Sequence, residues 1–281
     1  MIKLTNQVQF KPFTSRYEPT NAYWMAKFSE LSYYSKEDNS PDVEAIKSTL
    51  HSIDEKFSDV QGFSNKSSQG IVINHEDFIV AAFRGTDEIA DWLDNLNVSS
   101  QPSALGNIHT GFYKALMDIW PQMKSCIRSF RRALDDHPGK SLWLTGHSLG
   151  GALATLAAAT LIEADETFYG AYTFGSPRVG DRVFARNFNV EVKNKVFRFQ
   201  NNNDLVSRIP TRMMGYSHAG SFVYISEGGQ LNTDIGLWYR FIDTVKGVIA
   251  DIGEKGLDTI TDHNIQEYLN AISNYGDKSP A

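Results

Sequence analysis

The chain lacks the features of disulfide-built scaffolds, nucleic-acid-binding proteins and membrane-spanning proteins. Its 281 residues include one cysteine, Cys126, so no internal disulfide can form. Basic residues are scattered apart from Arg131 and Arg132, and the net charge is −6. Because a phosphate-binding surface needs clustered cations, nucleic acid is not an expected partner. No uncharged apolar run is long enough to cross a bilayer, so we expect no transmembrane segment.

The N-terminal residues also lack the apolar core of a signal peptide. The sequence as it stands therefore predicts a cytoplasmic protein. A mature form without its leader, or export without a cleaved peptide, would look the same, so secretion remains the alternative. Histidines and acids show no metal-ligand spacing, and we expect neither a metal nor an organic cofactor. The oligomeric state stays open.

The length and a hydrophobic content of 41% suit one large α/β domain covering residues 1–281. Hydrophobic periodicity predicts helices over 20–34, 42–57 and 111–134, with Pro121 kinking or breaking the third, and an alanine-rich helix ending near 162. Short apolar runs predict strands at 70–74, 78–83, 141–145, 168–174, 195–200 and 222–225. This alternation indicates a mainly parallel central sheet with helices on both faces. The tail 276–281 is expected to be frayed.

A serine stands at the junction of an apolar strand and the alanine-rich helix, in Gly146-His147-Ser148-Leu149-Gly150. This G-x-S-x-G pattern holds a nucleophile in a strained turn, where bulky neighbours would clash. The turn also directs the backbone N–H of Leu149, at the helix N-terminus, at any oxygen beside the serine. An ordinary glycine-rich turn is the alternative, but the flanking strand and helix favour a nucleophile.

A serine needs a base, and the base needs an orienting acid. In the α/β-hydrolase arrangement that this turn indicates, Asp or Glu and then His follow the serine. Of the two downstream histidines, His263 begins a helix beyond the last strand and is favoured over His218, which we expect to be structural. Asp204 follows the strand 195–200 at the sheet edge where such sites assemble. Its rivals are less suited, because Asp181 caps a helix and Asp262 adjoins the base.

With these residues in place, the sequence resembles the class 3 lipases, the family of the filamentous-fungal triacylglycerol lipases. The resemblance runs from about residue 21 to residue 268 and rests on five blocks in the family's order: V-A-A-F-R-G-T-D (80–87), H-T-G-F (109–112), L-T-G-H-S-L-G-G-A-L-A (144–154), Y-T-F-G-S-P-R-V-G-D (172–181) and D-L-V-S-R-I-P (204–210).

The resemblance implies an α/β-hydrolase fold with Ser148 as nucleophile, Asp204 as acid and His263 as base. It implies that Thr86 supplies its backbone N–H and its hydroxyl to an oxyanion hole beside the N–H of Leu149. His109 and His147 match family positions as structural residues. The chain departs from the family at Asn95, where an aspartate often fixes the oxyanion hydroxyl. An amide oxygen can still accept that bond.

The segment 87–98 lies where the family carries a short helical lid. Ile89, Trp92, Leu93 and Leu96 share one helical face, and the acids Asp87, Glu88, Asp91 and Asp94 take the rest. Periodicity alone would favour a helix packed permanently on the core, whereas the resemblance favours a lid that shelters the serine and opens onto lipid. Its four acids make neutral lipid the better surface. A second amphipathic run, a helical insertion at about 233–257, either extends this cover, pairs with another chain or packs on the core.

These observations predict a carboxylic ester hydrolase, foremost a triacylglycerol lipase, that meets its acylglycerol substrate transiently at a lipid–water interface. The same triad would serve a phospholipase A1 or a feruloyl-type esterase, or acyl transfer to an alcohol. A non-enzymatic lipid-binding module is the alternative from another class of protein. A missing triad member would be its signature, and none is missing.

Overall fold

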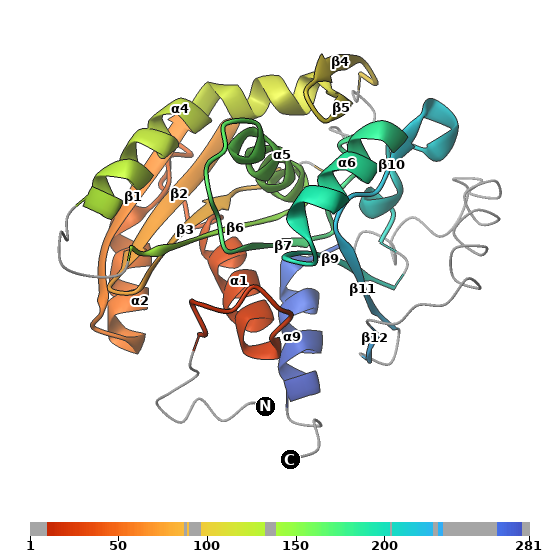
Figure 1. Ribbon diagram of the computed structural model, residues 1–281. Helices are drawn as coiled ribbons and strands as arrows, with labels where there is room; N and C mark the ends of the chain where they lie inside the picture. Colours follow the sequence, from red (N-terminus) through yellow and green to blue (C-terminus); the bar gives the residue numbers. More distant parts are fainter. Residues whose placement is uncertain are drawn as a thin grey trace.

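An eight-stranded sheet runs through the part of the protein that the computed structural model describes, residues 10–86, 89, 97–132, 139–202, 204–226, 230–232 and 263–276 (Figure 1). The strand order is β1-β2-β3-β6-β7-β9-β11-β12. The central strands β3, β6, β7, β9 and β11 are parallel, while β1, β2 and β12 join antiparallel at the two edges. The bounds are β1 Phe57–Asn65, β2 Ser68–His75, β3 Phe78–Phe83, β6 Ser141–His147, β7 Gly170–Phe174, β9 Val196–Asn201, β11 Ser221–Ile225 and β12 Leu231–Asn232.

The central strands are the ones that the sequence predicts. Every residue of β3, β6, β7 and β9 is buried, because helices cover both faces of a parallel sheet and its strands therefore read as apolar runs. The edge strand β1 was not predicted. Its sequence F-S-D-V-Q-G-F-S-N is largely polar, and half of the strand faces solvent.

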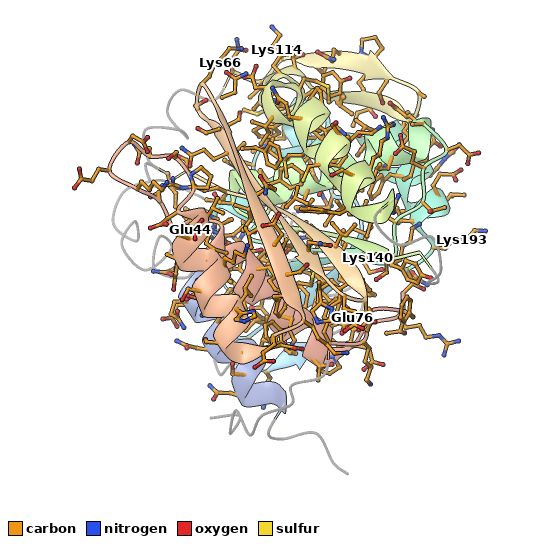
Figure 2. All side chains as sticks on the ribbon, turned by 90° about the vertical axis from the view of Figure 1, so that its left-hand side faces the viewer. Glu44, Lys66, Glu76, Lys114, Lys140 and Lys193 are labelled. Carbon is orange, nitrogen blue, oxygen red and sulfur yellow. The ribbon has the colours of Figure 1, made fainter. Side chains whose placement is uncertain are left out.

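Two layers of helices enclose the sheet. Helices α1, α2 and α9 pack on one face, and α4, α5 and α6 pack on the other, each with its own apolar core (Figure 1). In Figure 2 the β1–β2 hairpin, with Lys66 at its turn, runs between α2, which carries Glu44, and α4. The bounds are α1 Pro19–Leu31, α2 Val43–Ile53, α4 Thr110–Arg132, α5 Leu149–Glu163, α6 Arg182–Val192 and α9 Ile265–Gly276. The expected mainly parallel sheet with helices on both faces is confirmed.

Helix α4 passes through Pro121 without a break, so of the two expected outcomes, a kink or a break, the break is excluded. Proline removes one backbone hydrogen bond from a helix. Here the apolar side chains before and after it, among them Trp120 and Met123, are buried in the core. Trp120 Nε1 also donates to Thr160 Oγ1 on α5, at 2.8 Å. Tertiary packing of this face offsets the lost bond. The second expected helix is shorter than predicted, since α2 ends at Ile53.

A small second sheet, in the order β10-β8-β5-β4, lies beside α6. Its strands are β4 Ser100–Ser103, β5 Gly106–His109, β8 Gly180–Asp181 and β10 Tyr216–Ser217, and the 3₁₀ turns η1 Val206–Arg208 and η2 Arg212–Met214 lead into β10. These strands of two to four residues are too short for a period-2 pattern to be read from the sequence.

Several predicted segments lie outside the described residues. Of the lid face, Trp92, Leu93 and Leu96 lie outside, while Ile89 is helical and half-buried. Asn95, Asp262, the segment 233–257 and residues 277–281 also lie outside. Among the described helices none is long and apolar enough to cross a membrane. Within the same residues no three His, Cys, Asp or Glu side chains gather as a metal site.

Candidate active site

Ser148 occupies the sharp turn between β6 and α5. Its backbone has φ 58° and ψ −130°, a region that non-glycine residues rarely adopt. Its N–H donates to the carbonyl of Phe174 at 2.9 Å, which ties the turn to the end of β7. A Cβ at Gly146 would collide with the carbonyl of Gly150, and one at Gly150 would collide with the carbonyl of Phe83. The glycines are therefore required by backbone-to-backbone approach.

Asp204 and His263 meet beside this turn. Asp204 Oδ2 accepts a hydrogen bond from His263 Nδ1 at 2.9 Å, and both residues are fully buried. The other oxygen, Oδ1, accepts from the backbone N–H of Val206 at 2.9 Å. Because Nδ1 carries the proton toward the carboxylate, the neutral imidazole presents Nε2 as an acceptor, as a base requires.

The nucleophile is not yet bonded to this pair. Ser148 Oγ and His263 Nε2 are both buried, and neither has a hydrogen-bond partner among the described residues. Catalytic hydrogen bonds of this kind often form fully only when substrate is bound. The hydrogen-bonded pair of Asp204 and His263 is thus formed, and Ser148 lies beside it without a hydrogen bond to the imidazole.

Gly175 fixes the position of the acid–base pair. It has φ +59°, and a Cβ there would lie 2.7 Å from Asp204 Oδ2 and 2.7 Å from His263 Cε1. The carboxylate and the imidazole thus pack against the bare backbone at the end of β7. Sequence reasoning missed this residue, although a glycine directly after a buried strand was an available signal.

Tyr268 on α9 is a further residue that the sequence did not reveal. Its hydroxyl donates to Asp204 Oδ2 at 2.6 Å and accepts from the N–H of Asn201 at 2.9 Å. Burial, followed by the adjacent Asp204 carboxylate, raises the Tyr268 pKa well above its ordinary value, so the phenol keeps its proton. The aspartate therefore receives two donors on one oxygen, one from the base and one from the helix that follows it.

A second chain of hydrogen bonds holds the backbone of His263. His147 Nε2 donates to the His263 carbonyl, and Tyr33 Oη contacts His147 Nδ1 at 2.7 Å. Burial lowers the pKa of His147 well below its ordinary value, so the ring is neutral. With Nε2 protonated, Nδ1 must accept from the Tyr33 hydroxyl. The rings of His147 and His263 also pack together, 4.5 Å apart between centroids and tilted by 35°. His147 is structural, as the resemblance implies, and Tyr33 was missed.

The two oxyanion candidates approach the serine from different elements. Gly85 follows β3 and packs on the nucleophile, since a Cβ there would lie 3.0 Å from Ser148 Cβ and 2.7 Å from the His147 carbonyl. Thr86 comes next in the chain and is half-buried. Leu149 is the first residue of α5, so its N–H is one of the unpaired donors at a helix N-terminus. Gly85 and Leu149 thus adjoin the nucleophile, and the oxyanion roles of Thr86 and Leu149 stay predictions.

The remaining histidine candidates lie elsewhere. His109 stacks on Phe112 at 3.9 Å between ring centroids, its Nδ1 accepts from the Phe112 N–H, and burial lowers its pKa to about 4. Burial, followed by nearby arginines, lowers the pKa of His218 well below its ordinary value, and its Nδ1 has no hydrogen-bond partner among the described residues. Asp181 caps α6 by accepting from the N–H of Phe184 at 2.8 Å, as expected.

Residues 80–214 match the family described as lipase (class 3). The chain is 34% identical over 186 residues to a secreted mono- and diacylglycerol lipase of Fusarium solani, covering 65% of this chain and 54% of that protein. It is 31% identical over 159 residues to a lipase of Rhizomucor miehei, covering 54% and 43%. It is 29% identical over 243 residues to the rice protein phospholipase A1-II 1, covering 78% and 61%. The chain thus spans about half the length of the curated relatives that it matches.

Solved structures show the same fold. One is titled as a triacylglycerol lipase whose catalytic centre is a serine protease triad; it has a TM-score of 0.61 at 24% identity and covers 75% of this chain and 81% of that one. A mono- and diacylglycerol lipase from Aspergillus oryzae has a TM-score of 0.61 at 21% identity, covering 78% and 87%. This likeness shows an α/β-hydrolase fold.

Proposed function

We propose that the chain is a carboxylic ester hydrolase that cleaves acylglycerols through Ser148, His263 and Asp204, because residues 80–214 match the class 3 lipase family. The observation that carries the proposal is the buried hydrogen bond of 2.9 Å between Asp204 and His263, formed beside the strained Ser148 turn. The three residues come from distant parts of the sequence, and catalysis explains why they come together at this turn.

The reaction follows from this geometry. His263 Nε2 takes the proton of Ser148 as its oxygen attacks the ester carbonyl, and Asp204 stabilises the imidazolium that forms. The N–H groups of Thr86 and Leu149 hold the tetrahedral oxyanion, and losing one such donor costs about 3 kcal/mol of transition-state stabilisation. The imidazolium then protonates the leaving alcohol, and water releases the acyl group from the serine by the same route.

Access to the serine requires movement. Ser148, Asp204 and His263 are all shielded from solvent, so an ester carbonyl cannot contact Ser148 Oγ until a covering segment moves. We assign this movement to residues 87–98, whose apolar face includes Ile89, Trp92, Leu93 and Leu96. Trp92→Ala is expected to slow hydrolysis of long-chain emulsions more than hydrolysis of a short soluble ester. Equal effects on both substrates would contradict the lid.

The substrate proposal is a mono-, di- or triacylglycerol, supported by the fungal lipases among the relatives. The likeness to a rice phospholipase A1 keeps a phospholipid as the second candidate. Parallel assays on an acylglycerol emulsion, phosphatidylcholine and a feruloyl ester separate these activities. For location we propose secretion in place of a cytoplasmic protein, supported by the fungal relatives named as secreted.

Labelling with an organophosphate tests the chemistry directly. The unchanged protein should be modified once, on the peptide that contains Ser148, and Ser148→Ala should stay unlabelled and inactive. Ser125→Ala, which alters an exposed serine on α4, is the matched control and should label normally. Labelling of Ser148→Ala at the unmodified rate, or its retention of esterase activity, would overturn the proposal.

A further inference from the structure

Six exposed residues form a cationic and apolar surface, here called the α6–η2 patch. It comprises Arg182, Val183 and Arg186 at the start of α6, with Arg212, Met213 and Met214 of η2. Met213 is 90% exposed, Met214 56% and Val183 55%, a high exposure for apolar side chains of this size.

The two halves of the patch adjoin the same strand pair. Asp181 of β8 pairs with Tyr216 of β10. Arg182 follows Asp181 directly, and Met214 precedes Tyr216 by two residues. In Figure 1, α6 and β10 lie side by side. The start of α6 and the end of η2 are therefore brought together by this pair of strands.

The α6–η2 patch lies at the sheet edge that carries the candidate active site. Helix α6 follows β7, whose last residue accepts from the Ser148 N–H, and η2 follows β9 and Asp204. The connections that leave the carboxyl ends of parallel strands gather at one edge of the sheet. A surface that docks through the patch thus approaches the molecule on the side of the nucleophile.

The charge of the patch opposes that of the chain. The chain carries a net charge of −6, yet residues 205–226 hold two arginines and no acid. Asp181, next to Arg182, is already bonded to the Phe184 N–H and to Asn107 Nδ2. The one acid within α6, Glu191, lies about 140° around the helix axis from Arg186. Arg182 and Arg186 are one turn apart and share a face.

The methionines are presented by a short, ordered turn. The N–H of Met214 donates to the carbonyl of Thr211 at 3.1 Å, and the N–H of Gly215 donates to that of Arg212 at 3.0 Å. Met213 therefore stands at the tip of a turn that its own backbone bonds already hold. Insertion of the Met213 side chain into an apolar layer therefore costs little additional backbone conformational entropy.

We infer that the α6–η2 patch docks on an anionic lipid surface. The arginines would pair with phosphate or carboxylate oxygens of the headgroups, and the methionines and Val183 would enter the acyl boundary. Fatty-acid carboxylates released at an acylglycerol surface have the charge that this patch fits. The docking surface goes beyond the proposed hydrolysis and does not depend on it.

Vesicle sedimentation tests the inference without catalysis, because the Ser148→Ala protein serves as the parent. It should bind vesicles of phosphatidylcholine mixed with phosphatidylglycerol more tightly than vesicles of phosphatidylcholine alone. A basic residue near an anionic leaflet changes binding about fivefold, so Arg182→Ser with Arg186→Ser should weaken binding roughly 25-fold. The matched control, Lys36→Ser with Lys114→Ser, removes two exposed cations elsewhere and should change it less than about twofold.

Two further measurements complete the test. Met213→Ser with Met214→Ser should weaken binding to the mixed vesicles while leaving its salt dependence in place. Binding of the parent protein should fall as salt rises, a readout that needs no variant. The inference is overturned by equal binding to neutral and mixed vesicles, by binding that is insensitive to salt, or by equal losses in the arginine pair and the lysine pair.

Discussion

Replacing Gly175 by alanine should disable the candidate site while leaving the fold in place. The added Cβ would lie 2.7 Å from both Asp204 Oδ2 and His263 Cε1, whereas ordinary contact begins at 3.4 Å. The acid–base pair, or the backbone beneath it, must therefore move by about 0.7 Å. A misplacement on the order of 1 Å costs roughly 100-fold in rate, so we expect kcat to fall by about that factor.

A matched control separates this contact from backbone strain. Gly215 also has a positive φ, +88°, but a Cβ there would meet nothing within 4 Å. Both alanine variants should lose about 1–2 kcal/mol of unfolding free energy because of the left-handed conformation. Only Gly175→Ala places a methyl group against Asp204 and His263. Stability is measured by denaturant unfolding, and kcat on a short soluble ester that does not require a lipid surface. The reasoning is wrong if Gly175→Ala stays within a few fold of the unchanged protein, or if Gly215→Ala loses as much activity.

Three further predictions concern the residues around the site. Tyr268→Phe removes a charge-assisted hydrogen bond to Asp204, so it should lower the unfolding free energy by about 1.5–3 kcal/mol and reduce kcat rather than raise KM; an effect on KM alone would contradict this role. Tyr33→Phe leaves His147 Nδ1 without its donor and should lower kcat about tenfold, whereas unchanged kinetics would exclude positioning through the His263 carbonyl. Burial lowers the folded-state pKa of His109 to about 4, below the unfolded value of about 6.5, so the free energy of unfolding should fall as pH drops from 6.5 toward 4. In His109→Gln this fall should be smaller by about 1–2 kcal/mol, as measured by denaturant titrations at each pH.

The site residues that could be predicted from the sequence are those with a local chemical signal. Ser148 stands out because a strained turn restricts its neighbours, and Asp204 stands out because it follows a buried strand. His263 could be predicted because the histidine follows the serine and the acid in the chain order of α/β hydrolases. The structure brings Asp204 and His263 into contact as their positions suggested.

The supporting residues have no comparable local signal. Tyr268 reaches the Asp204 carboxylate because α9 packs against the sheet, and Tyr33 reaches His147 because α1 ends nearby. Each is an ordinary aromatic residue in or beside a helix, and only tertiary contacts reveal its function. Tertiary contacts also explain why Pro121 does not break α4, since the packing of this helix on the sheet overrides a local preference that the sequence displays.

The meeting of Gly150 with the Phe83 carbonyl has a consequence for how this protein can be altered. Phe83 leads into the loop of Thr86, and Gly150 belongs to the first turn of the helix that begins at Leu149. The spacing between the two proposed oxyanion donors would consequently be set by main chain touching main chain, with no side chain to repack. Libraries that seek new acyl specificity should therefore leave position 150 unchanged, because one methyl group there would collide with the Phe83 carbonyl oxygen and force the two backbone segments apart.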